Sequence, residues 1–126
     1  MRRSPVGPPF TTCQYGHIAI YSDIMTIARD DTFKRYARVL RALAHESRLK
    51  IVARLHEGEC CVCDLVELIG SDQSTVSRHL SVLRSNAIVD CERRGNHVYY
   101  RLTTPCVLEF MSCAAQVLRE RGGEDR

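Results

Sequence analysis

Residues 69–86 read IGSDQSTVSRHLSVLRSN, and this stretch decides the fold. Gly70 is a usual residue just past the end of a helix, and Ser71 or Asp72 can cap the start of the next one. Apolar residues then recur at spacings of four and three, which predicts one buried helical face: Val76, Leu80 and Leu83. The stretch therefore predicts a tight turn followed by a helix over Gln73–Asn86 whose first turns are polar.

Helical segments are also predicted upstream of the turn. Apolar residues recur at three and four from Phe33 to Ala44, and a second, shorter pattern begins near Ser47 and stops at Gly58. A third segment runs from about Val62 to Ile69. Three helices are thus expected before the one that opens at Gln73.

The period changes downstream. Ile88–Arg94 and His97–Leu102 are expected as two strands, because Gly95-Asn96 between them suits a tight hairpin turn. Pro105 is favoured at the first position of a last helix. That helix is apolar over a wide arc from Cys106 to Leu118, more than one small domain can cover, so a partner subunit is expected against it.

This order of elements is that of a winged helix-turn-helix, a mainly α fold with a β-hairpin wing. Because the last helix needs a partner, we expect the domain to dimerise through its terminal helices. Residues 1–30 begin with a Pro/Gly run and show no sustained period, so we expect a mobile arm there. Residues 31–120 are the predicted DNA-binding and sensing domain, and 121–126 a flexible tail. Met25 is an alternative start of translation.

Composition limits the class of protein. The 126 residues are 44% hydrophobic and 26% charged, as in one ordinary globular domain. No apolar run approaches the length of a membrane helix, and prolines occupy the place of a signal peptide's core, which predicts a cytoplasmic protein. Seven cysteines with irregular spacing fit a disulfide scaffold poorly and favour metal binding or redox sensing.

Charge is arranged in blocks. Residues 31–56 carry seven Lys or Arg against two acidic residues, whereas 57–72 carry five acidic residues and no Lys or Arg. Residues 73–101 are basic again, with five Arg against two acidic residues. The basic blocks are suited to phosphate and the acidic, thiol-rich block to a cation.

The polar opening of the helix at Gln73 is where a recognition helix places side chains that read DNA bases. Arg and Gln can pair with purine edges, and hydroxyls can reach bases or phosphates. Two arginines beside the hairpin turn can meet the DNA backbone or minor groove. The candidate DNA-binding residues are Gln73, Ser74, Thr75, Ser77, Arg78, His79, Arg93 and Arg94.

Residues 33–118 resemble the ArsR/SmtB family of metal- and metalloid-responsive repressors. The matching stretches are RALAHESRL at 41–49, ECCVCDL at 59–65, QSTVSRHL at 73–80 and GNHVYYRL at 95–102. The resemblance implies a homodimer that holds double-stranded operator DNA when metal-free and releases it when an effector binds.

Three cysteines, Cys60, Cys61 and Cys63, lie where the third helix begins. Exposed amides and the helix dipole favour thiolate there, the form that binds soft metals. In the family this segment senses arsenic and antimony, or cadmium, lead and zinc in a sister group. Cys61 and Cys63 match its two leading ligands.

The third ligand is open. Val66 stands where arsenic sensors have a third cysteine, so Cys60, Cys13 on the arm and Cys106 on the last helix are the candidates. Three thiolates would suit As(III) or Sb(III), the expected inducer, and a fourth would suit cadmium, lead or zinc. Cys106 and Cys113 lie on one face of the last helix and are expected in the core or dimer seam more than as ligands, and Cys91 is expected in packing.

Other classes have less support. A disulfide or persulfide switch could use the C-x-x-C from Cys60 to Cys63. An enzyme is not expected, because His45-Glu46 resembles a zinc-protease motif whose second histidine is replaced by Leu49. A structural zinc module would need a second paired-cysteine knuckle, which Cys106 and Cys113 do not form.

Overall fold

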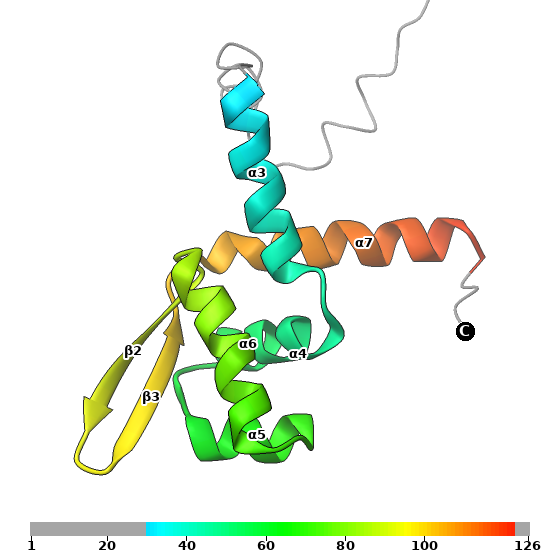
Figure 1. Cartoon of the computed structure of the whole chain (residues 1–126). Coiled ribbons are helices and arrows are strands. Elements are labelled where there is room, and N and C mark those ends of the chain that lie inside the picture. The colour runs from blue at the N-terminus through cyan, green and yellow to red at the C-terminus, as the bar shows by residue number, and fades with distance from the viewer. Residues whose placement is uncertain (1–29, 123–126) are drawn as a thin grey trace, which may run out of the picture. The chain divides into compact units, whose positions relative to one another are not determined.

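The computed structural model describes residues 30–122 (Figure 1). The predicted arm over residues 1–29, with Cys13 and Met25, and residues 123–126 of the predicted tail lie outside this range. The chain divides into two compact units after Ala37, and every element from α4 onward belongs to the second.

The described elements are helices, three short strands and one 3-10 turn, η1. In chain order they are α3 (Asp30–Leu43), α4 (Glu46–His56), β1 (Cys60–Cys61), α5 (Val62–Ile69), α6 (Gln73–Ser85), β2 (Val89–Arg94), β3 (His97–Leu102), η1 (Pro105–Val107) and α7 (Leu108–Glu120). The predicted helices and hairpin are therefore confirmed, with ends shifted by a few residues. Pro105 opens the 3-10 turn rather than the last α-helix itself.

The turn between α5 and α6 follows from local chemistry. Gly70 ends α5 with a φ of 76°, a left-handed conformation that glycine adopts without strain. Asp72 begins α6, and its carboxylate accepts a hydrogen bond from the backbone N–H of Thr75. These two residues fix the angle at which α6 leaves α5.

Strand β1 was not predicted. It adds to the hairpin as a third antiparallel strand in the order β1-β3-β2, with Cys60 opposite Tyr100 and Cys61 opposite Tyr99. A strand of two residues shows no period in the sequence, so only its pairing with β3 reveals it. In Figure 1 the hairpin of β2 and β3 projects beside α6 as the wing.

The core lies between α4, α5, α6 and the sheet. Seven side chains are almost completely buried in it: Ile51, Val52, Leu65, Val76, Leu80, Leu83 and Val89. The apolar face predicted for α6 is thus confirmed, and α5 and α6 pack against one another through it.

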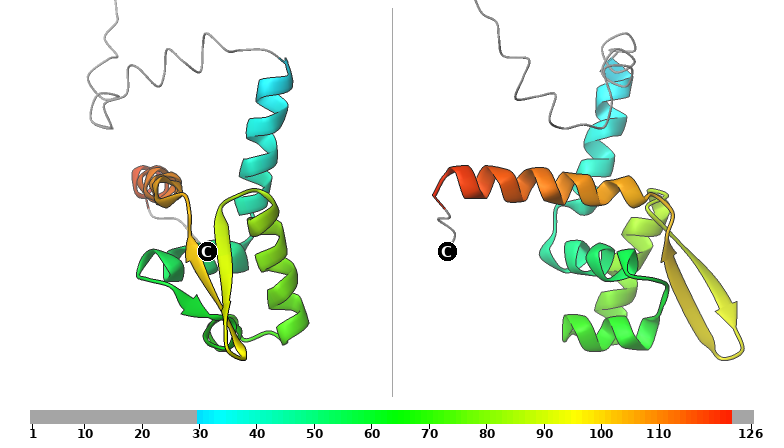
Figure 2. Two further views of the ribbon diagram at one scale, coloured as in Figure 1. Left: turned by 90° about the vertical axis from the view of Figure 1, so that its left-hand side faces the viewer. Right: turned by 180° about the vertical axis from the view of Figure 1, so that it is seen from behind.

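Helix α7 contributes no buried side chain, although Val107 just before it is buried. Phe110, Val117 and Leu118 on α7 are each about half exposed. Figure 2 shows α7 continuing from the end of the wing, and it contacts α4. The apolar arc predicted for this helix therefore remains uncovered within the described chain. None of the helices in residues 30–122 has the length and hydrophobicity that crossing a membrane requires.

Replacing Asp72 by Ala should lower the midpoint of thermal unfolding by several degrees, because α6 loses its cap. Hydrogen bonds from Ser74 and Thr75 lower the pKa of Asp72 to about 2, from an ordinary value of 3.8. The carboxylate therefore stabilises the fold above pH 3.8, and this contribution disappears as the pH falls to 2. Circular dichroism melts should show the difference between the two proteins shrinking over that interval. Asp72→Asn, which keeps a capping oxygen but not the charge, should melt between wild type and Asp72→Ala. Equal melts for wild type and Asp72→Ala would contradict the assignment.

Candidate metal centre and nucleic-acid interface

The two faces of the sheet separate the adjacent thiols. Successive side chains of a strand point to opposite faces, so Cys60 and Cys61 cannot share one. Cys60 pairs with Tyr100 on the inner face and joins the core, whereas Cys61 pairs with Tyr99 on the outer face. His97 lies two residues before Tyr99 on β3 and so has the same outward orientation.

Three potential ligand atoms gather on this outer face. The Sγ atoms of Cys61 and Cys63 are 2.7 Å apart, and Cys61 Sγ is 3.9 Å from Nδ1 of His97. All three atoms lie within 4.8 Å of one another. Cys61 is buried, but Cys63 and His97 are exposed, so small rotations of the latter two can adjust the spacing. The residues present therefore fit a soft or borderline metal ion.

Cys60 does not join this group, although it was a predicted third ligand. Its side chain is 2% exposed, and its thiol lies 3.6 Å from the carbonyl oxygen of Cys61 and 4.0 Å from a carboxylate oxygen of Asp64. Burial raises the pKa of Cys60 above its ordinary value, which disfavours the thiolate. Cys60 is a packed thiol in this structure.

The predicted activation of Cys63 by the start of a helix is wrong for this arrangement. The hydrogen bond with Cys61 raises the pKa of the Cys63 thiol, and desolvation and the charge of Asp64 act in the same direction. The raised pKa favours the protonated form of Cys63 over the thiolate. A metal ion would have to displace the proton of Cys63 on binding.

The remaining cysteines of residues 30–122 do not belong to this group. Cys106 in η1 and Cys113 on α7 are exposed, and Cys91 on β2 is partly buried opposite Tyr100. Neither Cys106 nor Cys113 is packed in the core of the described chain. Cys13 lies outside the described residues.

Helix α6 exposes four residues of its predicted DNA-reading set to solvent: Gln73, Ser74, Ser77 and Arg78. The hydroxyls of Ser74 and Thr75 donate hydrogen bonds to the carboxylate of Asp72, so both take part in the helix cap.

His79 points toward α4 rather than away from the protein. Nη1 of Arg48 lies 3.3 Å from Nδ1 of His79, and the ring centroids of His79 and His45 are 4.4 Å apart. Burial, with the nearby His45 and arginines, lowers the pKa of His79. The ring is therefore suited to accept a hydrogen bond from Arg48 and to hold α6 against the start of α4.

The wing arginines differ in their surroundings. Arg94 makes ion pairs with Glu59, at 2.6 Å, and Glu92, at 3.2 Å, and its guanidinium lies 4.8 Å from the centre of the Tyr99 ring. On the same outer face Arg101 pairs with Asp90 and Glu92. Arg93 is exposed and has no ion pair with any other residue of the 30–122 segment.

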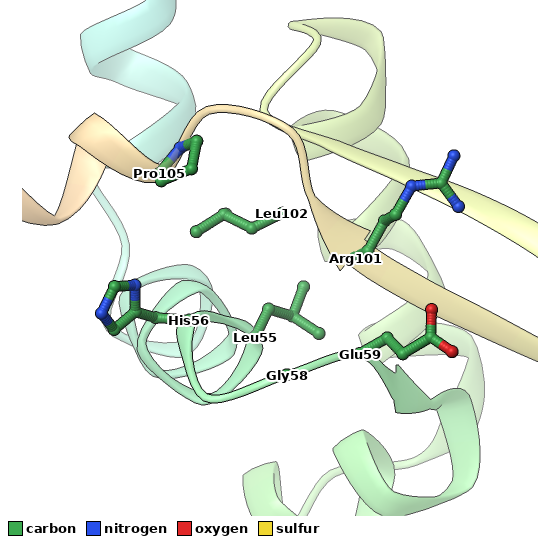
Figure 3. A pocket seen from close by; sticks show the side chains of 7 residues that line it. All are labelled: Leu55, His56, Gly58, Glu59, Arg101, Leu102 and Pro105. Atoms are coloured by element: carbon green, nitrogen blue, oxygen red, sulfur yellow. The ribbon is translucent and has the colours of Figure 1, made fainter.

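A separate pocket of about 410 Å³ opens between the end of α4, the end of β3 and η1 (Figure 3). Its lining contains no cysteine, and the Arg101 and Glu59 side chains lie at one edge of it. The pocket is therefore distinct from the thiol group, although Glu59 also binds Arg94 of the wing.

Comparison with known proteins agrees with this architecture. A family model described as bacterial regulatory protein, arsR family, matches residues 45–90. The cadmium resistance transcriptional regulatory protein CadC of Listeria innocua is 37% identical over 81 residues, which cover 64% of this chain and 68% of that protein. The chain belongs to the ArsR family.

Other ArsR-family relatives extend the comparison. The arsenical resistance operon repressor of Escherichia coli is 42% identical over 67 residues, covering 52% of this chain and 57% of that protein. The solution structure of a homodimeric winged helix-turn-helix DNA-binding domain from Mycobacterium bovis, a possible ArsR-family transcriptional regulator, has a TM-score of 0.64 at 26% identity. The match covers 79% of this chain and 99% of the Mycobacterium bovis chain.

The predicted family and fold are thereby confirmed. Proteins with this fold and these sequences are DNA-binding transcriptional regulators, so this ArsR-family chain is a regulator and not an enzyme. His97 is the member of the cluster of Cys61, Cys63 and His97 that the sequence analysis missed. Its signal lies in the pairing of β1 with β3, which no local pattern in the sequence displays.

Proposed function

We propose that this chain is a homodimeric repressor that binds operator DNA and releases it when a thiophilic metal or metalloid binds Cys61 and Cys63. The observation that carries the proposal is the contact between these two thiols at the start of α5. The names of the cadmium and arsenical relatives support a metal or metalloid effector. The acting unit is residues 31–120, in the cytoplasm where operator DNA lies.

The coupling between effector and DNA runs through α5. This helix begins beside both thiols, packs against α6 and is joined to it by a turn of three residues, 70–72. A metal that draws the two sulfurs onto one ion would shift the start of α5, and α6 would shift with it. The two recognition helices of a dimer would then no longer match successive major grooves. A coupling of about 1–3 kcal/mol is sufficient for such a switch.

Dimerisation is proposed through α7, with α3 as the second terminal helix. The exposed apolar residues of α7 need cover that the described chain does not supply. The homodimeric Mycobacterium bovis domain supports this arrangement. A dimer also gives two recognition helices, as two half-sites of an operator require.

Two classes of effector compete for the thiols. As(III) or Sb(III), the inducers expected from the sequence, favour three thiolates, but Cys60 faces the core. Cys13 or Cys106 would then have to supply the third sulfur. Cadmium, lead or zinc accept mixed sulfur and nitrogen donors, and the position of His97 favours this second class.

Fluorescence anisotropy of labelled DNA from upstream of this protein's own gene tests the function. The reduced, metal-free protein should bind this DNA, and binding should decrease near one equivalent of effector per protomer. Arsenite and cadmium should be titrated separately at one salt concentration, because DNA affinity depends on salt. Tight binding that neither effector relieves would contradict the proposal and favour a thiol-redox switch, which mild reductant would reverse.

Replacing Arg78 by Ala should weaken operator binding by about tenfold to hundredfold, because an arginine that pairs with a guanine edge contributes about 1–3 kcal/mol. Arg78 is exposed on the outer side of α6, so its loss should not unfold the protein. Anisotropy with the operator and with point-substituted operators checks both affinity and sequence preference. Arg119→Ala, a change of an exposed arginine on α7, is the matched control. An equal loss on every DNA sequence would show that Arg78 contacts only phosphate.

A further inference from the structure

We propose that His97 completes a metal site with Cys61 and Cys63, that this site takes a divalent thiophilic cation such as Zn²⁺ or Cd²⁺, and that the bound ion joins the wing to the start of α5. The proposal rests on the function proposed above, because it shares the two thiols. It adds the third ligand and the class of ion.

The backbone itself brings His97 to the thiols. Antiparallel pairing places Tyr99 opposite Cys61, and His97 lies two positions along β3 on the same face. Cys63 follows within the first turn of α5 and lies over that face, with its sulfur in contact with Cys61. The three ligand atoms therefore come from a strand, the start of a helix and the wing. Cys61 and His97 are 36 residues apart in the sequence.

The donor set decides the class of ion. Two sulfurs and one imidazole are a usual combination for Zn²⁺, which binds four ligands in a tetrahedron and accepts Cys and His together. Cd²⁺ has similar preferences among soft ligands. As(III) does not favour an imidazole ligand in the same way. A ligand role for His97 therefore distinguishes Zn²⁺ and Cd²⁺ from As(III).

His97 is free to act as a ligand. Its side chain is exposed, and its only ring neighbour in the described residues is Tyr99, at 6.4 Å between centroids. Arg94, directly opposite in the strand pair, is held by Glu59 and Glu92. The cation of Arg94 is thereby neutralised, and a divalent ion beside His97 does not meet an unpaired positive charge.

Binding at this site would act on the wing as well as on α5. His97 directly follows the Gly95-Asn96 turn, and Arg93 and Arg94 directly precede it. An ion held by His97 and both thiols would fix the wing relative to the start of α5. The two DNA-contacting parts of the domain would then change their positions together.

Cadmium titration of the reduced full-length chain tests the site. The absorption band of cadmium bound to thiolate reports Cys61 and Cys63, and competition with a fluorescent chelator gives the affinity. His97→Ala should lower the affinity by at least about tenfold while the thiolate band remains. Cadmium NMR of the wild-type complex should show coupling from the ion to the ring protons of His97. His56→Ala, which removes an exposed histidine on α4, is the matched control and should leave the affinity unchanged.

The outcomes separate this proposal from the function on which it rests. Unchanged cadmium affinity in His97→Ala, together with loss of binding in Cys63→Ser, would overturn the role of His97 and leave the thiol sensor intact. Unchanged affinity in Cys61→Ser and Cys63→Ser would overturn both. Metal-free operator binding by His97→Ala, equal to that of wild type, would show that the variant is folded and that its lower affinity supports the role of His97 as a ligand.

Discussion

The Cys63→Ser variant should bind operator DNA as tightly as wild type and should fail to release it when cadmium or arsenite is added. Serine oxygen is a poor ligand for soft ions, so one of the two paired sulfurs is lost. Cys63 is exposed at the first turn of α5, and the substitution keeps its shape there. A release that changes affinity by up to about a hundredfold in wild type should therefore disappear.

Anisotropy of labelled operator DNA, with and without metal, measures this effect. Cys113→Ser is the control, since it changes an exposed cysteine of α7 outside the thiol group, and it should release DNA like wild type. Normal release from folded Cys63→Ser would show that the effector binds elsewhere. Loss of DNA binding in the absence of metal would show that Cys63 has a structural role instead.

The Leu80→Ala variant should lose about 2–5 kcal/mol of unfolding free energy. Leu80 lies on α6 and its side chain is completely buried in the core. Its truncation therefore creates a cavity and also removes apolar contacts. Small domains are stable by only about 5–15 kcal/mol, so this is a large fraction of the total. DNA binding should fall with it, because α6 is positioned through this face.

Chemical denaturation followed by circular dichroism measures the loss. Leu68→Ala makes the same substitution at a side chain of α5 that is 46% exposed, and it should cost far less. Similar midpoints for the two variants would mean that α6 does not depend on the packing of Leu80. The slope of the denaturation curve should stay close to wild type if the variant still folds cooperatively.

Most of the fold could be predicted because it is local. The apolar spacing of Val76, Leu80 and Leu83 defines the buried face of α6, and Gly70 and Asp72 define the turn before it. Gly95-Asn96 likewise marks the hairpin. The exact start of α7 could not be predicted in this way, because proline is acceptable at the first position of a 3-10 turn as well as of an α-helix.

The candidate site was predictable only in part because its geometry depends on pairing between distant segments. Cys61 and Cys63 were named from the sequence, and they are in contact. Cys60 faces the core and Cys61 faces the other side of the sheet because both lie in strand β1. This strand is too short to show any periodicity in the sequence. His97 could not be identified without the register of β1 on β3.

For the predicted DNA-reading residues, the structure adds which side chains also bond within the protein. Sequence position shows which residues begin α6, but it does not show which of their polar groups the protein itself uses. Ser74 and Thr75 bind Asp72, and His79 lies against Arg48. Gln73, Ser77 and Arg78 are exposed on α6, and their side chains make no hydrogen bond or ion pair within residues 30–122.

The ion pairs on the outer face of the wing have a consequence for the thermodynamics of DNA association. A basic side chain that neutralises a DNA phosphate releases a counterion, which makes affinity fall steeply with salt. Arg94 and Arg101 are already neutralised by carboxylates of the protein, so they gain little by exchanging those partners for phosphate. We therefore expect the salt dependence of DNA binding to depend on Arg93 at the tip of the wing and on α6 more than on Arg94 and Arg101.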